Sequence, residues 1–104
     1  MPYVRVNMVE FKRKEDMQKD MESLHNNMKS IFPEMRLFLA MEASETASVS
    51  ISVYDNKEAA DRQLEGRRKH MEDFNVSDAF FHEGKVLAFY ADNEQIDKLV
   101  KSVS

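Results

Sequence analysis

A row of hydroxyl side chains runs through the segment from Ala47 to Tyr54, alternating strictly with apolar residues. This alternation is typical of a β-strand whose two faces differ. The hydroxyl groups belong to Ser48, Ser50, Ser52 and Tyr54. Such a row either lines a small-molecule pocket or fills a hydrated interface. Tyr54 is the best candidate to donate a hydrogen bond to a ligand carbonyl, because a phenol at a strand end buries its ring and keeps its hydroxyl accessible.

A second polar row lies on the first predicted strand, residues 3–11, where Arg5 and Asn7 alternate with valines and a methionine. If the two strands are neighbours, Arg5 and Asn7 lie beside Ser50 and Ser52 and form the floor of a pocket. Alternation alone cannot tell which face of a sheet a row occupies. The pocket and a hydrated interface both remain open, and we favour the face that the helices cover.

Three polar residues mark the predicted helix 57–74. Arg67 interrupts its apolar stripe, and Gln63 and His70 flank it on the same side. Arginine binds a carboxylate through two parallel hydrogen bonds, so Arg67 is a candidate partner for an anionic substrate group. Alternatively, its stem covers apolar surface while the guanidinium reaches water.

His25 borders the apolar stripe of the other predicted helix, residues 14–31. With an ordinary pKa of about 6.5, a histidine there could act as a general base, or it could lie half-buried at the margin of the core. His82 shares a strand face with Phe80 and could belong to an interface. The three histidines show no metal-ligand spacing, so we expect no metal site.

Composition excludes several functional classes. The net charge of −4 argues against a nucleic-acid partner. Two glycines are too few for a phosphate-binding loop, and the absence of cysteine excludes disulfides and thiolate nucleophiles. No apolar run approaches the roughly 20 residues that cross a bilayer. With no signal peptide at the N-terminus, we expect a cytoplasmic protein without a membrane partner.

Hydrophobic periodicity outlines seven elements within 104 residues. They are strand 3–11, helix 14–31, strand 36–43, strand 47–54, helix 57–74, strand 78–90 and a short helix after residue 92. Gly84 interrupts the last strand, and we expect a β-bulge there rather than a hairpin turn. Residues 1–91 then form one domain and residues 92–104 a helical tail.

The order βαββαβ is that of an α+β, ferredoxin-like fold. Right-handed crossovers place both helices on one face of an antiparallel sheet with strand order 4-1-3-2. The other face is apolar and uncovered, and its patch is larger than monomers usually expose. We therefore expect a homodimer formed through this sheet face.

In element order, in spacing and in the aromatic-rich segment FFHEGKVLAFY, residues 2–91 resemble the dimeric α+β barrel superfamily. That superfamily includes antibiotic-biosynthesis monooxygenases and haem-degrading monooxygenases. The resemblance implies two sheets paired face to face and a ligand pocket between each sheet and its helices. The haem-degrading members carry an asparagine and a histidine that Asn7 and His70 match. They also use a tryptophan, which this chain lacks, and Gln63 stands nearest that position. Only this narrower resemblance implies haem; otherwise we expect no cofactor.

Three functions are compatible with these residues. The first is a cofactor-independent monooxygenase acting on an aromatic or polyketide-like molecule, with His70 or His25 as base and Asn7 among the hydrogen-bond donors. The second is a tautomerase, because MPYVRVN resembles the opening of that superfamily. Pro2 would be its base once Met1 is removed, and Arg5 or Arg36 its anion partner. The third is a binding module without catalysis.

Overall fold

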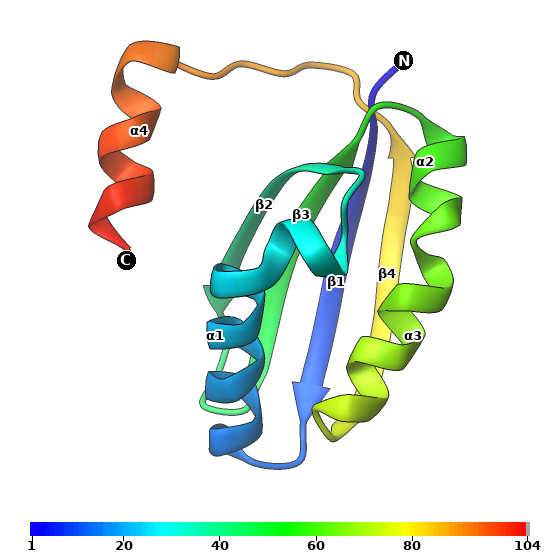
Figure 1. Ribbon diagram of the computed structural model, residues 1–104, viewed down its shortest axis with the longest axis vertical. Helices are drawn as coiled ribbons and strands as arrows, with labels where there is room; N and C mark the ends of the chain where they lie inside the picture. Colours follow the sequence, from blue (N-terminus) through cyan, green and yellow to red (C-terminus); the bar gives the residue numbers. More distant parts are fainter. Residues whose placement is uncertain (104) are drawn as a thin grey trace.

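The computed structural model describes residues 1–103, which form a four-stranded antiparallel sheet with helices on one face (Figure 1). The sheet has the order β2-β3-β1-β4, which is the predicted order read from the opposite edge. The ferredoxin-like βαββαβ fold is thereby confirmed. Its elements are β1 (Tyr3–Phe11), α1 (Lys14–Ile31), β2 (Met35–Glu42), β3 (Ala47–Tyr54), α2 (Lys57–Arg62), α3 (Leu64–Asp73), β4 (Val76–Lys85) and α4 (Asn93–Ser102).

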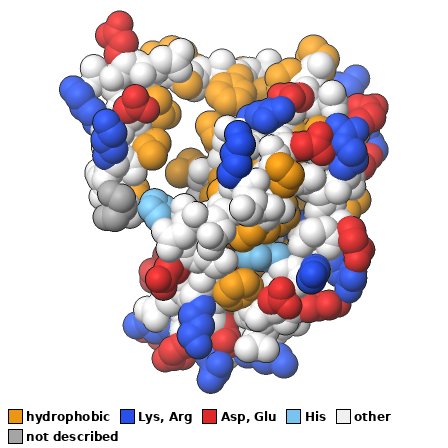
Figure 2. All heavy atoms as spheres, in the orientation of Figure 1, with side chains coloured by type: hydrophobic (Ala, Val, Ile, Leu, Met, Phe, Trp, Pro, Cys, Tyr) orange, Lys and Arg blue, Asp and Glu red, His pale blue; other side chains and the backbone are white. Residues whose placement is uncertain are grey.

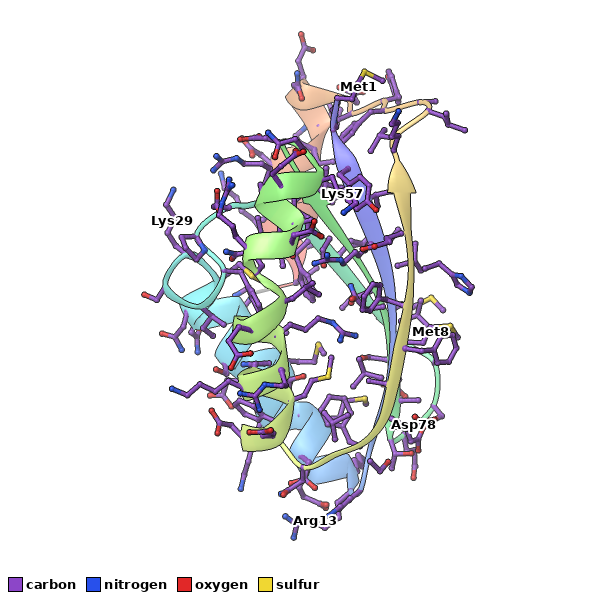
Figure 3. All side chains as sticks on the ribbon, turned by 90° about the vertical axis from the view of Figure 1, so that its right-hand side faces the viewer. Met1, Met8, Arg13, Lys29, Lys57 and Asp78 are labelled. Carbon is purple, nitrogen blue, oxygen red and sulfur yellow. The ribbon has the colours of Figure 1, made fainter. Side chains whose placement is uncertain are left out.

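The polar rows of the two central strands are buried between the sheet and the helices. Asn7 pairs with Ser50 on β3 and with Phe81 on β4. Arg5 is only 1% exposed and Ser52 only 3%. This burial confirms that the serine row faces the helices. The opposite rows form the outer face, from which Met8 projects away from the helices (Figure 3).

The predicted helix 57–74 is divided into α2 and α3 at Gln63. There the backbone N–H of Gln63 donates to the carbonyl of Ala60, three residues back, so the helix tightens locally. None of the residues of α3 is fully buried. The helix therefore covers the polar rows with half-buried side chains such as Met71, which lines the space beneath it.

The last strand is shorter than the sequence predicted. β4 ends at Lys85 instead of Tyr90 because its partner β1 begins at Tyr3, opposite Lys85. Beyond this pair, the backbone N–H of Val86 donates to the carbonyl of Pro2. Gly84 forms neither a bulge nor a turn and pairs regularly with Val4. The irregularity lies at the other end of the pairing, between Glu10 and Phe11.

Beyond β4, an extended segment leads to α4, which lies apart from the sheet and its helices (Figure 1). Hydrophobic side chains gather on the side of α4 that faces the body of the molecule, across a hollow (Figure 2). Five large hydrophobic residues of this region are at least three-fifths exposed: Leu87, Tyr90, Leu99, Val100 and Val103. No helix in residues 1–103 has the length and apolar character needed to span a membrane.

Asp16 joins the start of α1 to the turn before β4. Its carboxylate accepts hydrogen bonds from Arg13 at 3.0 Å and from Asn75 at 3.2 Å. Asn75 has a φ of 55°, a left-handed conformation that asparagine tolerates better than most residues. The hydrogen bonds from Arg13 and Asn75 lower the pKa of Asp16 below its ordinary value.

This lowered pKa predicts a loss of stability in acid. The stability contributed by the Asp16 carboxylate is fully present above its unfolded pKa, about 3.9, and is lost as pH falls through the lower folded value. We expect Asp16→Asn to be less stable at neutral pH and to lose less stability on acidification below about pH 4. Chemical unfolding followed by circular dichroism across this range measures both effects. Parallel curves for the variant and the wild type would contradict the assignment.

Candidate functional site

A small cavity of about 60 Å³ lies between the sheet and the helices α1 and α3. Its apolar lining includes Met21, Leu24, Phe32 and Met71. Its polar lining comes from four elements and consists of Asn7, Asp20, Ser48, Ser50, Ser52, Tyr54, Arg67 and His70. The cavity thus combines an apolar wall with convergent polar groups, which is the usual composition of a small-molecule site.

A chain of hydrogen bonds joins the sheet floor to α3. The Asn7 side-chain N–H donates to Ser52 Oγ at 3.0 Å, and Arg67 Nε donates to Asn7 Oδ1 at 3.4 Å. The Arg67 guanidinium lies over the Phe81 ring, 4.6 Å from its centroid. These contacts hold a cation against the polar floor of the cavity.

One hydrogen-bond donor of Arg67 finds no acceptor among the described residues. Its Nη2 is buried and has no hydrogen-bond partner in residues 1–103. Burial, together with the nearby charge of Arg5, lowers the pKa of Arg67. A buried donor without a partner costs about 1–3 kcal/mol. An oxygen atom of a ligand, above all an anionic one, would relieve this cost.

His70 and Asp20 both line the cavity and contact each other directly. His70 Nε2 is hydrogen-bonded to Oδ1 of Asp20, which comes from α1 and is only 5% exposed. The rings of Phe32 and Phe74 lie against the imidazole, with centroids 5.9 and 4.7 Å away. The histidine is therefore held in place by one carboxylate and two aromatic rings.

Asp20 is the residue that sequence analysis missed. It follows Met17 by three residues and precedes Leu24 by four, so it lies on the buried stripe of α1. A carboxylate on an apolar stripe requires a partner. That position was the signal that could have identified it.

Tyr54 lines the same cavity from the end of β3. Burial raises the pKa of its phenol, although the nearby Arg5 acts in the opposite direction. The phenol thus keeps its proton at neutral pH and can donate a hydrogen bond to a ligand.

The structure places Arg5, Gln63, His25 and Pro2 outside the cavity lining. The Arg5 guanidinium is engaged by Glu83 at 2.7 Å, by the Ala60 carbonyl at 2.7 Å and by Asp61 at 3.3 Å. It is therefore occupied within the protein instead of facing a ligand. His25 is exposed because it lies one residue beyond Leu24, about 100° around the helix from the buried stripe.

Gln63 and the N-terminal proline have other surroundings. The Gln63 amide donates to Glu34 at 3.4 Å, and its Oε1 is buried without a partner in residues 1–103. Pro2 is exposed before β1 and its carbonyl accepts from Val86. Arg36, the other anion partner considered for a tautomerase, is paired with Asp55 at 2.9 Å. Both arginines considered as anion partners of Pro2 are thus engaged within the protein.

The residues present do not fit haem. The cavity of about 60 Å³ is far smaller than a porphyrin, and the Nε2 of His70 is occupied by Asp20. Residues 1–103 contain no group of three or more histidine, aspartate or glutamate side chains placed to hold a metal ion.

No family model matches the chain, and no curated protein sequence matches it. Solved structures do. The dimeric ferredoxin-like protein from an uncultured marine organism superposes with a TM-score of 0.62 at 13% identity, over 86% of this chain and 91% of that one. A variant of SnoaB, a cofactor-independent oxygenase from Streptomyces nogalater, superposes with a TM-score of 0.66 at 12% identity, over 88% of this chain and 98% of that one. A proposed antibiotic biosynthesis monooxygenase from Chloroflexus aurantiacus superposes with a TM-score of 0.68 at 11% identity, over 88% of this chain and 98% of that one.

These likenesses show that the chain has the fold of the dimeric α+β barrel proteins, as the resemblance had implied. Proteins of unknown function share it too. At 13% identity or less, such a match shows the fold and no activity.

Proposed function

We propose that the protein is a homodimer that binds a small molecule between its sheet and α3 and oxidises it with dissolved oxygen, without a bound cofactor. The substrate class is an electron-rich, enolisable aromatic or polyketide-like molecule. One observation carries the proposal: Arg67 and His70 line the same cavity, and a buried donor of Arg67 has no partner among residues 1–103. Its neighbours in fold include a cofactor-independent oxygenase.

In this reaction the substrate supplies the electrons. His70 removes a proton from a CH₂ group between an aromatic ring and a carbonyl, and Arg67, Ser50 and Tyr54 stabilise the enolate. The enolate reduces O₂ and combines with it as a peroxide anion, which recovers the proton to form a hydroperoxide. Loss of water then leaves a new carbonyl. In total, CH₂ and O₂ become C=O and H₂O.

A ring-sized substrate requires the cavity to open. Its present volume of about 60 Å³ holds a few water molecules, whereas a cavity of about 150 Å³ is needed to bind benzene. Met21 and Met71 line it, and methionine side chains adapt readily to different shapes. Because α3 has no fully buried residue and is separated from α2 at Gln63, it is the element that moves to admit the ligand.

The homodimer follows from the outer face of the sheet. Large apolar side chains are exposed there, including Leu39 at 63%, Met41 at 60% and Phe80 at 50%. A contiguous patch of this kind on a soluble protein marks an interaction surface. A similar structure is that of a dimeric protein, which supports a second copy of this chain as the partner.

The activity is tested with 2-tetralone, whose C1 methylene lies between an aromatic ring and a carbonyl. We expect the wild type to consume one O₂ for each 2-tetralone oxidised. His70→Phe should lower the rate on the order of 100-fold or more, because general bases contribute about that much. His25→Phe is the matched control, since His25 is exposed, and should keep the wild-type rate. Binding of 2-tetralone without oxygen consumption would show that the protein is a binding module and not an oxygenase.

Arg67 is tested with the enolate of 1,3-cyclohexanedione, a small anionic ring. Replacing Arg67 by methionine should weaken binding roughly 10- to 100-fold, because hydrogen bonds to charged groups contribute about 1.5–3 kcal/mol. Arg68→Met is the matched control, because Arg68 is exposed and paired with Glu65 and Glu72. Calorimetric titration measures the affinity of both variants for the enolate. Equal losses of affinity would count against Arg67 as the anion partner.

A further inference from the structure

The pair formed by His70 and Asp20 indicates which nitrogen of the imidazole does the chemistry. Asp20 is 5% exposed, and His70 is the only side chain in residues 1–103 that hydrogen-bonds to it. An ionised carboxylate only accepts hydrogen bonds. If Asp20 is ionised, the hydrogen bond between the two needs a hydrogen on His70 Nε2.

The other ring nitrogen, Nδ1, is then left as the free base. It has no hydrogen-bond partner within residues 1–103, and the ring to which it belongs lines the cavity. Phe32 and Phe74 pack against the ring and restrict its rotation. In a neutral imidazole one nitrogen donates and the other accepts. With the hydrogen on Nε2, the lone pair of Nδ1 is therefore free to accept a proton.

Arg67 lies one helical turn before His70, on the same face of α3. A ligand oxygen on Arg67 Nη2 would thus sit next to the imidazole. The ligand that uses both groups has an oxygen on one carbon and an acidic C–H on the adjacent carbon, which is the pattern of an enolisable ketone.

We propose that Asp20 is a positioning residue that fixes His70 in the Nε2–H tautomer, making Nδ1 the base for an enolisable ketone whose oxygen is held by Arg67. This inference rests on the proposed function of the cavity. The substrate C–H bond breaks and its proton forms an N–H bond at Nδ1. The electron pair moves to the carbonyl oxygen as an enolate facing Arg67. Asp20 stabilises the imidazolium, and returning the proton to carbon completes an exchange that needs no oxidant.

The first test requires no ligand. The ¹⁵N spectrum of the His70 ring should show a hydrogen on Nε2 and none on Nδ1 in the wild type at neutral pH. In Asp20→Asn the amide can donate to Nε2 and shift the hydrogen to Nδ1. A hydrogen on Nδ1 in the wild type would overturn the inference even if Asp20→Asn failed to fold.

The second test follows exchange of the C1 hydrogens of 2-tetralone in D₂O under argon. Asp20→Asn should lower kcat at least 100-fold while KM changes less than about threefold; in a serine protease the analogous change costs about 10⁴-fold through the wrong tautomer. Glu22→Gln, which removes an exposed carboxylate of α1, should match the wild type. If the wild type exchanges these hydrogens and Asp20→Asn does so at the same rate, only the role of Asp20 is refuted. A wild type that neither binds 2-tetralone nor exchanges its hydrogens would refute the proposed function.

Discussion

Replacing Ile51 by lysine is expected to abolish the proposed homodimer while leaving each subunit folded. Ile51 lies at the centre of the outer face, paired with Val6 on β1 and Leu39 on β2. In a single subunit Ile51 is partly exposed, so a lysine there can extend its ammonium group into water. In a dimer formed through the face, the same charge is buried without a partner.

The expected size of the effect follows from symmetry. An unpaired buried charge costs at least about 3 kcal/mol, and a twofold dimer contains two copies. The total of about 6 kcal/mol corresponds to a roughly 10⁴-fold weaker dimer. Sedimentation velocity measures it. Gln18→Lys adds the same charge to the exposed side of α1 and should leave the dimer intact. A wild type that is a monomer, or an Ile51→Lys variant that still dimerises, would show that this face is not the interface.

Replacing Arg5 by methionine is expected to cost about 2–4 kcal/mol of stability. The Arg5 side chain is 1% exposed, and its loss leaves the Ala60 carbonyl, Asp61 and Glu83 without their partner. The two carboxylates are 42% and 30% exposed, so water replaces part of what is lost. This places the expected cost slightly below that of a fully buried pair.

Arg36→Met is the matched control for Arg5. Arg36 and Asp55 form an ion pair in which both side chains are more than half exposed. Such surface pairs contribute at most about 1 kcal/mol. Denaturant unfolding of the two variants gives the comparison. If both lose the same amount of free energy, Arg5 is not the structural residue that its contacts indicate, and its assignment as a ligand-binding residue would return.

The fold was predicted well where the pattern is local. The bounds of β1, α1 and β3 agree with the predicted ranges because alternation in the two strands and a regular apolar stripe in the helix run through most of each element. The end of β4 was wrong because the length of an edge strand depends on its partner. The sequence of residues 86–90 is apolar, but β1 has no residue left to pair with it.

The candidate site was predicted in part, for the same reason. Asn7, Ser50, Ser52, Tyr54, Arg67 and His70 line one cavity, because alternation and helical spacing place them on the faces that meet. The sequence could not show that Arg5 is hydrogen-bonded to Glu83, 78 residues away, or that Asp20 is hydrogen-bonded to His70, 50 residues away. Such pairings depend on the packed structure. In the sequence, each partner looks like an ordinary charged residue.

Binding of a small oxygen anion, such as an enolate, in the cavity between the sheet and α3 is tested most directly by titrating ¹⁵N-labelled protein with the enolate of 1,3-cyclohexanedione and mapping the amide shifts. We expect saturable shifts at Ser50, Ser52 and the segment of α3 from Arg67 to His70, all of which surround the cavity. Shifts that do not saturate, or that fall on the outer face of the sheet instead, would contradict it.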